Sequence, residues 1–83
     1  MIILILHLIQ HNFIMEYGKI KWFDAQKGFG FIEPENGGKD IFVHRNNIQN
    51  LGFEEGLADG EEVEYDVEET PKGLSAIEVS RIG

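Results

Sequence analysis

The sequence predicts a small all-β protein, a closed or partly closed barrel of five short strands. Runs of β-branched and aromatic residues alternate with turn signals that contain Gly, Asn and Pro. After Met15, no stretch repeats its apolar residues at the period of an α-helix. The 83 residues also suit a single domain with a modest core. These three observations together favour a small barrel over a helical or mixed fold.

The first two strands are expected over residues 17–24 and 28–33, joined by a short turn at residues 25–27. Ile20 is the expected core residue of the first strand. The second strand is expected to end before Pro34, because a proline nitrogen cannot donate to a β-ladder.

The third strand is expected over residues 40–44, after a turn or hairpin signal at Asn36-Gly37-Gly38. Because side chains alternate between the two faces of a strand, its residues divide into two sets. The sets are Ile41 with Val43 on one face and Phe42 with His44 on the other.

A long connection over residues 46–59 leads to the last two strands. Its apolar residues are candidates for anchoring it to the barrel: Ile48, Leu51, Phe53 and Leu57. The fourth strand is expected over residues 62–69, where apolar residues alternate with acids at the period of a half-buried strand. A turn at residues 70–73 precedes the fifth strand, over residues 74–82. The inward candidates of this last strand are Ala76, Ile77 and Val79.

The stretch Lys27-Gly28-Phe29-Gly30-Phe31-Ile32 alternates glycine with aromatic residues. On a strand, Phe29 and Phe31 point to the same face, where they would form a flat apolar platform on which a nucleobase can stack. The glycines would allow a neighbouring backbone or a ligand to approach closely. The alternative is that both phenylalanines belong to the core and that the glycines mark a bulge.

Aromatic and basic side chains of the first three strands converge on one face if these strands form an antiparallel meander. This set contains Lys21, Trp22, Phe23, Lys27, Phe29, Phe31, Phe42 and His44. Aromatic side chains can stack bases and lysines can contact phosphates, so the set predicts a nucleic-acid-binding face with salt-dependent affinity. Exposed aromatic side chains in a row are otherwise a liability for a monomeric protein.

Three aromatic positions have a structural interpretation as well as a binding one. Strict alternation would place Trp22 with Ile20 in the core, and a bulge would be needed to bring it outward. His44 could instead be a solvated strand histidine. Phe53 could pin the long connection to the barrel rather than stack a base.

The net charge of −8, taken alone, argues against binding to phosphate backbones. Nine of the fifteen acids, however, lie between Glu54 and Glu69, whereas most basic residues flank the aromatic stretches. A local basic face is therefore compatible with an acidic protein, and its binding would depend mainly on stacking. The absence of cysteine excludes a disulfide framework and a thiolate metal site, and it suits a reducing cytoplasm.

Residues 1–15 differ in composition from the rest of the chain, because they contain no Lys, Arg, Asp or Glu. The apolar run over residues 2–9 is far shorter than the ~20 residues of a membrane-spanning helix, and no signal-peptide pattern is present. Three interpretations are open: a functional start at Met15 with a segment before it that is not native, an extra strand, or a hydrophobic tail that promotes association or contact with a membrane surface. His7 and His11 would share one face of a helix, but no third ligand accompanies them, so no metal site is expected.

Residues 16–83 resemble a bacterial cold shock protein, the single-domain form of the cold shock domain. The segment Gly18-Lys19-Ile20-Lys21-Trp22-Phe23 resembles the family's opening strand, Lys27 to Ile32 matches its first ribonucleoprotein-type motif, and Ile41-Phe42-Val43-His44 matches its second. The resemblance covers about four fifths of the chain, and the joint occurrence of the three motifs is highly specific. It implies a five-stranded antiparallel OB-fold barrel that binds single-stranded RNA and DNA. It also implies an RNA chaperone role that prevents or melts secondary structure, with transcription antitermination or translation regulation as related roles.

Carried over by position, the resemblance implies a contact set for nucleic acid: Lys21, Trp22, Lys27, Phe29, Phe31, Phe42, His44 and Phe53. Lys72 lies where the family often has a basic residue in the last hairpin loop. Where the family usually has an aromatic residue after the second motif, this chain has Arg45. A guanidinium can stack on a base and contact a phosphate, so we expect altered binding with a stronger salt dependence.

No catalytic function is expected, because the sequence contains no apparent Ser/His/Asp or Cys/His set and its acids are spread along strands. No cofactor or small-molecule substrate is expected either, and the expected state is a cytoplasmic monomer or weak homodimer without membrane contact. The alternative function is a protein-interaction or self-assembly module that uses the aromatic face and the Ile-rich N-terminal residues. Such self-association would strengthen with salt, whereas nucleic-acid binding would weaken.

Overall fold

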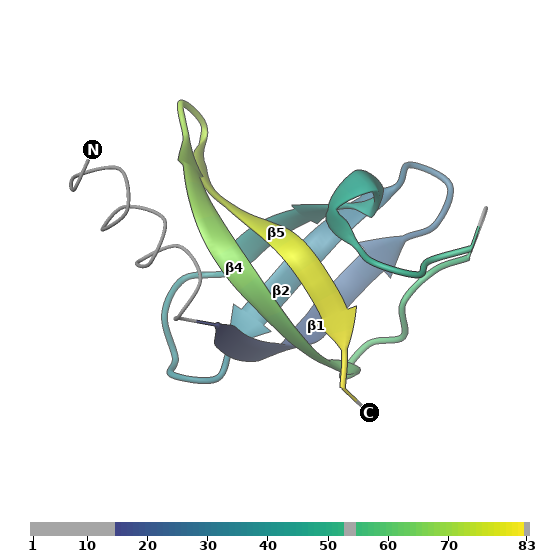
Figure 1. Ribbon diagram of the computed structural model, residues 1–83, viewed down its shortest axis with the longest axis horizontal. Helices are drawn as coiled ribbons and strands as arrows, with labels where there is room; N and C mark the ends of the chain where they lie inside the picture. Colours follow the sequence, from purple (N-terminus) through teal and green to yellow (C-terminus); the bar gives the residue numbers. More distant parts are fainter. Residues whose placement is uncertain (1–14, 53–54, 83) are drawn as a thin grey trace, which may run out of the picture.

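The computed structural model describes residues 15–52 and 55–82, which form a closed barrel of five strands (Figure 1). The strands are β1 (Glu16–Asp24), β2 (Phe29–Pro34), β3 (Ile41–His44), β4 (Glu62–Thr70) and β5 (Gly73–Arg81). One short 3-10 helix, η1 (Arg45–Asn47), follows β3, and the described part of the chain contains no α-helix. The predicted all-β fold class is confirmed.

The strands follow the order β1-β2-β3-β5-β4 around the ring, and β4 closes the ring on β1. The pair formed by β3 and β5 is parallel, and all other neighbouring pairs are antiparallel. A closed ring with an odd number of strands cannot alternate its direction at every step. The expected antiparallel barrel therefore has one parallel pair, which is formed by β3 and β5.

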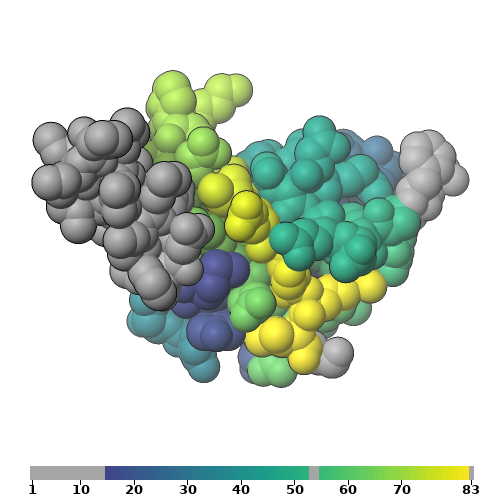
Figure 2. All heavy atoms as spheres, viewed as in Figure 1, coloured from purple at the N-terminus to yellow at the C-terminus, as the bar shows by residue number. Residues whose placement is uncertain are grey.

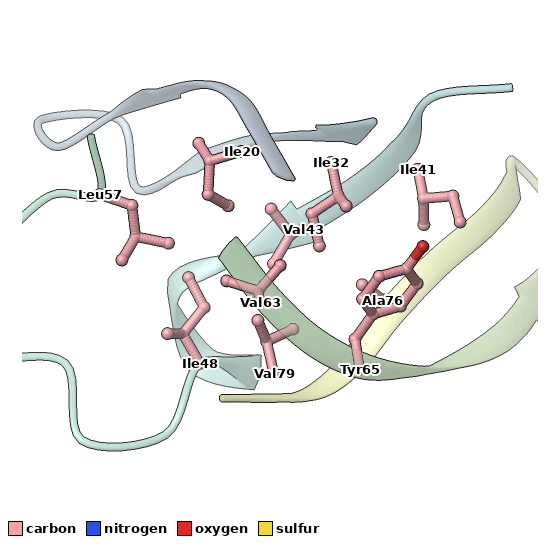
Figure 3. Close-up of a cluster of buried hydrophobic side chains, with 10 residues drawn as sticks. All are labelled: Ile20, Ile32, Ile41, Val43, Ile48, Leu57, Val63, Tyr65, Ala76 and Val79. Atoms are coloured by element: carbon pink, nitrogen blue, oxygen red, sulfur yellow. The ribbon is translucent and has the colours of Figure 1, made fainter. Parts of the chain in front are cut away.

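Among the described residues, ten buried hydrophobic side chains fill the barrel (Figure 3): Ile20, Ile32, Ile41, Val43, Ile48, Leu57, Val63, Tyr65, Ala76 and Val79. Ile48 and Leu57 come from the long connection, which they anchor to the barrel as predicted. Leu51, from the same connection, packs against this core while partly exposed. In β2, β3 and β4, the two-residue alternation of the sequence predicted correctly which face of each strand is buried.

The boundaries of β2 differ from the prediction at both ends. Gly28 lies in the preceding turn with a φ of +79°, so the strand begins at Phe29. Pro34 belongs to the strand and pairs with Gly18 of β1. The pairing of β2 with β3 stops at Ile32, so the nitrogen of Pro34 does not face a ladder partner there and a proline is tolerated.

The buried residues of β5 are three positions apart rather than two. Ala76 and Val79 are fully buried, and Ile77 is half-buried. The register with β4 shifts between Glu64 and Asp66, and Glu78 has a φ of +51°. This bulge inserts one residue and returns the strand's apolar side chain to the core.

Candidate nucleic-acid interface

Four aromatic rings from β1, β2 and β3 lie next to one another and form what we call the aromatic platform: Trp22, Phe29, Phe31 and Phe42. In the sheet register, Trp22 is opposite Phe31, and Phe31 is opposite Phe42. The alternate residues of β2 and β3 are buried, so the rings lie on the outer face of the barrel. The predicted convergence of the three strands on one face is confirmed for these four rings. The prediction was wrong for Phe23, which packs against the core instead.

The rings are close but do not cover one another. Neighbouring ring centroids are 5.4 Å apart for Trp22–Phe31, 5.7 Å for Phe29–Phe42, and 5.9 Å for Trp22–Phe29 and for Phe31–Phe42. The ring planes are inclined to one another by 31° to 76°, so none of these pairs is a parallel stack. Trp22 keeps 39 % of its surface exposed. The platform therefore leaves aromatic surface accessible for flat partners.

Trp22 reaches the outer face because β1 contains a bulge. Ile20 pairs with Ile32, but the next pair along β2 joins Phe31 to Trp22, so Lys21 is the extra residue. The bulge reverses the alternation of β1, which places Trp22 outside and lets Phe23 pack against the core. Of the two interpretations of Trp22, the structure supports the outward one.

Gly30 makes this arrangement sterically possible. A Cβ atom at this position would lie 2.2 Å from the carbonyl oxygen of Trp22 and 2.8 Å from the Cα of Phe23. The backbone of β1 thus lies so close to position 30 of β2 that only glycine fits there. The glycine between the two phenylalanines therefore positions the tryptophan on the other strand.

His44 extends the platform at the end of β3, opposite Phe29. Its Nδ1 accepts a hydrogen bond of 3.1 Å from the backbone N–H of Asn46 and thereby caps η1. The bond requires the lone pair on Nδ1, so the neutral ring carries its hydrogen on Nε2. The imidazole is half-buried, and its hydrogen bond holds it in one orientation. This orientation is compatible with the capping role and with stacking of a base on the ring.

Two predicted contact lysines lie at opposite ends of the platform. Lys27 is exposed in the β1–β2 turn, at the end where Phe29 pairs with Asp24. Lys21 donates a hydrogen bond of 2.7 Å to Oδ2 of Asp40, just before β3. The hydrogen bond and the negative charge of Asp40 raise the pKa of Lys21 above its ordinary value of 10.5. Lys21 is therefore a cation with a partner, whereas the ammonium group of Lys27 has no hydrogen-bond or ion-pair partner among residues 15–52 and 55–82.

Lys72 lies in the hairpin loop between β4 and β5, where Thr70 pairs with Gly73. Because β3 and β5 run parallel and pair Phe42 with Ser75, this hairpin lies at the end of the sheet where β3 begins. Figures 1 and 2 show the hairpin, in light green, projecting beyond the barrel. Lys72 is thus at the same end of the platform as Lys21.

Arg45 is engaged with backbone rather than presented to solvent on the platform. Its terminal nitrogens donate to the carbonyl oxygens of Ala25 (2.8 Å), Gly52 (3.1 Å) and Glu55 (3.2 Å). Ala25 belongs to the β1–β2 turn, and the other two belong to the long connection. The guanidinium therefore joins two loops at the Lys27 end of the platform.

Several predicted features lie outside the described residues. These are Phe53, the histidines at positions 7 and 11, and the whole N-terminal segment through residue 14. Within the described part, no group of three His, Cys, Asp or Glu residues is arranged to hold a metal ion. No helix in this part is long and apolar enough to cross a membrane.

Sequence reasoning missed two acidic residues that shape the site. Asp40 pairs with Lys21, as described above. Oδ1 of Asp24 accepts hydrogen bonds of 2.9 Å from the backbone N–H groups of Gln26 and Lys27, which orders the turn that carries Lys27. An Asp at the start of a short turn is a recognisable signal for such a bond, whereas the Asp40 pair depends on the register and has no local signal.

The fold and the site define a class: small β-barrel proteins that present aromatic rings between basic side chains and bind nucleic acid. A family profile described as "'Cold-shock' DNA-binding domain" matches residues 16–82. The chain therefore belongs to the cold shock domain family, whose domain binds nucleic acid.

Curated relatives agree with this assignment. The chain is 46 % identical to the major cold shock protein of Micrococcus luteus over 68 residues, which are 82 % of this chain and 100 % of the relative. It is 53 % identical to the cold shock-like protein CspE of Buchnera aphidicola over 62 residues, covering 75 % and 88 % of the two chains. The cold shock-like protein CspC of Escherichia coli is 48 % identical over 65 residues, covering 78 % and 93 %.

A solved structure shows the same fold. The structure described as Drosophila Unr CSD456 matches 92 % of this chain with a TM-score of 0.68 and 20 % sequence identity. The match spans 30 % of that longer chain. At this identity the likeness concerns the barrel alone.

Proposed function

We propose that this protein binds single-stranded RNA and DNA on the aromatic platform and acts as a cytoplasmic RNA chaperone. The observation that carries the proposal is the set of four outward rings whose neighbouring centroids are 5.4–5.9 Å apart. This spacing exceeds the roughly 3.4 Å between successive bases of a stacked strand. Bases that lie on successive rings must therefore be separated from one another, as they can be in a single strand and not in a duplex.

A chaperone role follows from mass action. A base that is stacked on Phe29, Phe31 or Phe42 is not available for pairing, so binding shifts a hairpin towards its open form. Each stacked base contributes about 1–3 kcal/mol. A few such contacts would open marginal hairpins without any catalytic step. Antitermination and translation regulation would be consequences of the same effect on hairpins in messenger RNA.

The first test is a titration of the full chain with a short oligo-dT, followed by Trp22 fluorescence at low and at moderate salt. We expect saturable quenching, because Trp22 is part of the platform and 39 % exposed. The logarithm of the affinity should fall with the logarithm of the salt concentration with a slope of about −0.7 per phosphate contact. A duplex of the same length should compete weakly.

Two results would overturn the proposal. The absence of binding at any salt concentration, measured also by anisotropy of a labelled strand, would remove the nucleic-acid function. A change in fluorescence that depends on protein concentration alone and strengthens with salt would instead indicate that the platform serves self-association.

The ion pair between Lys21 and Asp40 gives a second prediction. Asp40→Asn should raise the affinity for oligo-dT by roughly 1.5- to 5-fold at low salt, because this exposed ion pair is weak and competes with a phosphate for Lys21. The same variant should make the salt slope steeper. Anisotropy titrations at several salt concentrations measure both effects.

The matched control is Glu62→Gln, which makes the same charge change at an exposed position of β4, a strand that carries none of the four platform rings and where Glu62 pairs with Lys19. If the two variants bind oligo-dT equally well, the gain is a general charge effect and Lys21 is not held back by Asp40.

A further inference from the structure

We propose that Arg45 is a positioning residue: it holds the β1–β2 turn and the long connection in one arrangement at the Lys27 end of the platform, and it does not contact the bound strand. The effect on binding rests on the function proposed above, whereas the effect on the two loops does not. This role differs from the stacking and phosphate contact that the sequence led us to expect of Arg45.

The contacts of Arg45 connect three segments of the chain. Its backbone N–H donates to the carbonyl oxygen of Gly28 (2.8 Å), which places the residue beside the end of the turn. One terminal nitrogen of its side chain donates to Gly52, and the other donates to both Ala25 and Glu55. The planar guanidinium can reach acceptors in different directions at once, which the single ammonium group of a lysine cannot reproduce with the same geometry.

Each of the two loops is also closed by hydrogen bonds of its own. In the turn, the N–H of Gly28 donates to the carbonyl oxygen of Asp24 (2.7 Å). In the connection, the N–H of Glu55 donates to the carbonyl oxygen of Gly52 (3.0 Å), and Oε1 of Glu55 accepts from the N–H of Gly52 (2.7 Å). The bond from Gly52 and the pairing with Arg81 hold the pKa of Glu55 below its ordinary value of 4.5.

Among the described residues, the hydrogen bonds that join one loop to the other all come from the Arg45 guanidinium. The loops also touch where Gly56 packs on Ala25, because a Cβ at Gly56 would lie 3.1 Å from the Cβ of Ala25. Arg45 thus fixes the relative position of two loops that are already in contact.

The same geometry argues against direct contact of Arg45 with nucleic acid. A guanidinium has five N–H donors, and the described carbonyls accept three of these bonds. Bidentate binding of a phosphate would require the terminal nitrogens to leave these carbonyls. Arg45 therefore does not stack on a base but holds the two loops in place before the strand binds. Loops that are already ordered lose less conformational freedom on binding.

The test compares Arg45→Lys and Arg45→Gln with the unmodified full chain, at a temperature where all three are folded. We expect both variants to weaken oligo-dT binding by a similar factor of roughly three to ten, because neither can reproduce the three carbonyl bonds. Arg45→Gln removes the positive charge and should still leave the salt slope unchanged, because Arg45 does not contact a phosphate. In the matched control Lys27→Gln, an exposed cation at the same end of the platform is lost, so the slope should become shallower by about 0.7.

Amide hydrogen exchange of the free variants tests the loops without any ligand. In Arg45→Lys, the amides of Gly28 and Glu55 should exchange several-fold faster, while the core amide of Val43 is unchanged. A uniform acceleration that includes Val43 would show a general loss of stability and would contradict the proposal. Unchanged exchange together with full binding by Arg45→Lys would also overturn it, since a cation alone would then suffice. If the unmodified chain binds no oligo-dT, the proposed function fails, and the exchange data still decide whether Arg45 couples the loops.

Discussion

Phe31→Ala is expected to weaken the binding of a short oligo-dT by about 5- to 150-fold, which corresponds to the roughly 1–3 kcal/mol of one stacked base. Phe31 contacts two other rings of the platform, since its centroid lies 5.4 Å from that of Trp22 and 5.9 Å from that of Phe42. Its removal takes away one stacking surface and one neighbour that holds Trp22. Fluorescence anisotropy of a labelled strand measures the loss independently of any change in Trp22 emission.

Two controls separate stacking from a general loss of apolar surface. Phe31→Tyr keeps an aromatic face and should retain most of the affinity. Ile82→Ala removes a side chain that is 50 % exposed and is not part of the platform, so it should bind as the unmodified chain does. Equal binding by Phe31→Ala and Ile82→Ala would show that the bound strand does not use the platform.

Gly30→Ala is expected to lower the free energy of unfolding by about 3 kcal/mol or more. The new Cβ would lie 2.2 Å from a backbone oxygen and 2.8 Å from a backbone carbon, so β1 itself has to move. Overpacked interiors typically lose about 1–3 kcal/mol, and the displacement of backbone places this site at the upper end. For a domain of this size, such a loss lowers Tm by roughly 12 to 24 °C, which calorimetry or circular dichroism would detect.

The matched control is Gly38→Ala, at a site where the nearest atom to an added Cβ is a side-chain oxygen at 3.6 Å. This change should leave Tm nearly unaltered. If Gly30→Ala were as stable as Gly38→Ala and kept the Trp22 emission of the unmodified chain, the close approach of the two strands would not determine where Trp22 lies.

The sequence carried enough information to predict the barrel and the faces of most strands. Val63 and Tyr65 alternate with acids, and Ile41 and Val43 alternate with Phe42, so a period of two identified the buried face of β3 and β4. Alternation could not settle the outward position of Trp22 or the burial of Val79. In both strands a bulge shifts the period by one residue, and a bulge depends on the partner strand.

The polar half of the site was less predictable, because it depends on pairs that are distant in sequence. Lys21 is 19 residues from Asp40, and Arg45 is 20 residues from Ala25. Residue type indicated that both side chains are cations near the aromatic strands. Only the folded chain shows that one is paired with a carboxylate and that the other donates to three carbonyls.

The order of strands in the ring also determines when the binding face becomes usable during synthesis on the ribosome. The strands that carry the platform come first, but their inner side chains have no cover until β4 and β5 supply Val63, Tyr65, Ala76 and Val79. Both closing pairs, β1 with β4 and β3 with β5, join segments distant along the chain and therefore form late. A nascent chain that ends after β3 thus has the aromatic residues without a rigid surface to hold them. On the function proposed above, binding of nucleic acid should therefore begin only once the last strand has emerged.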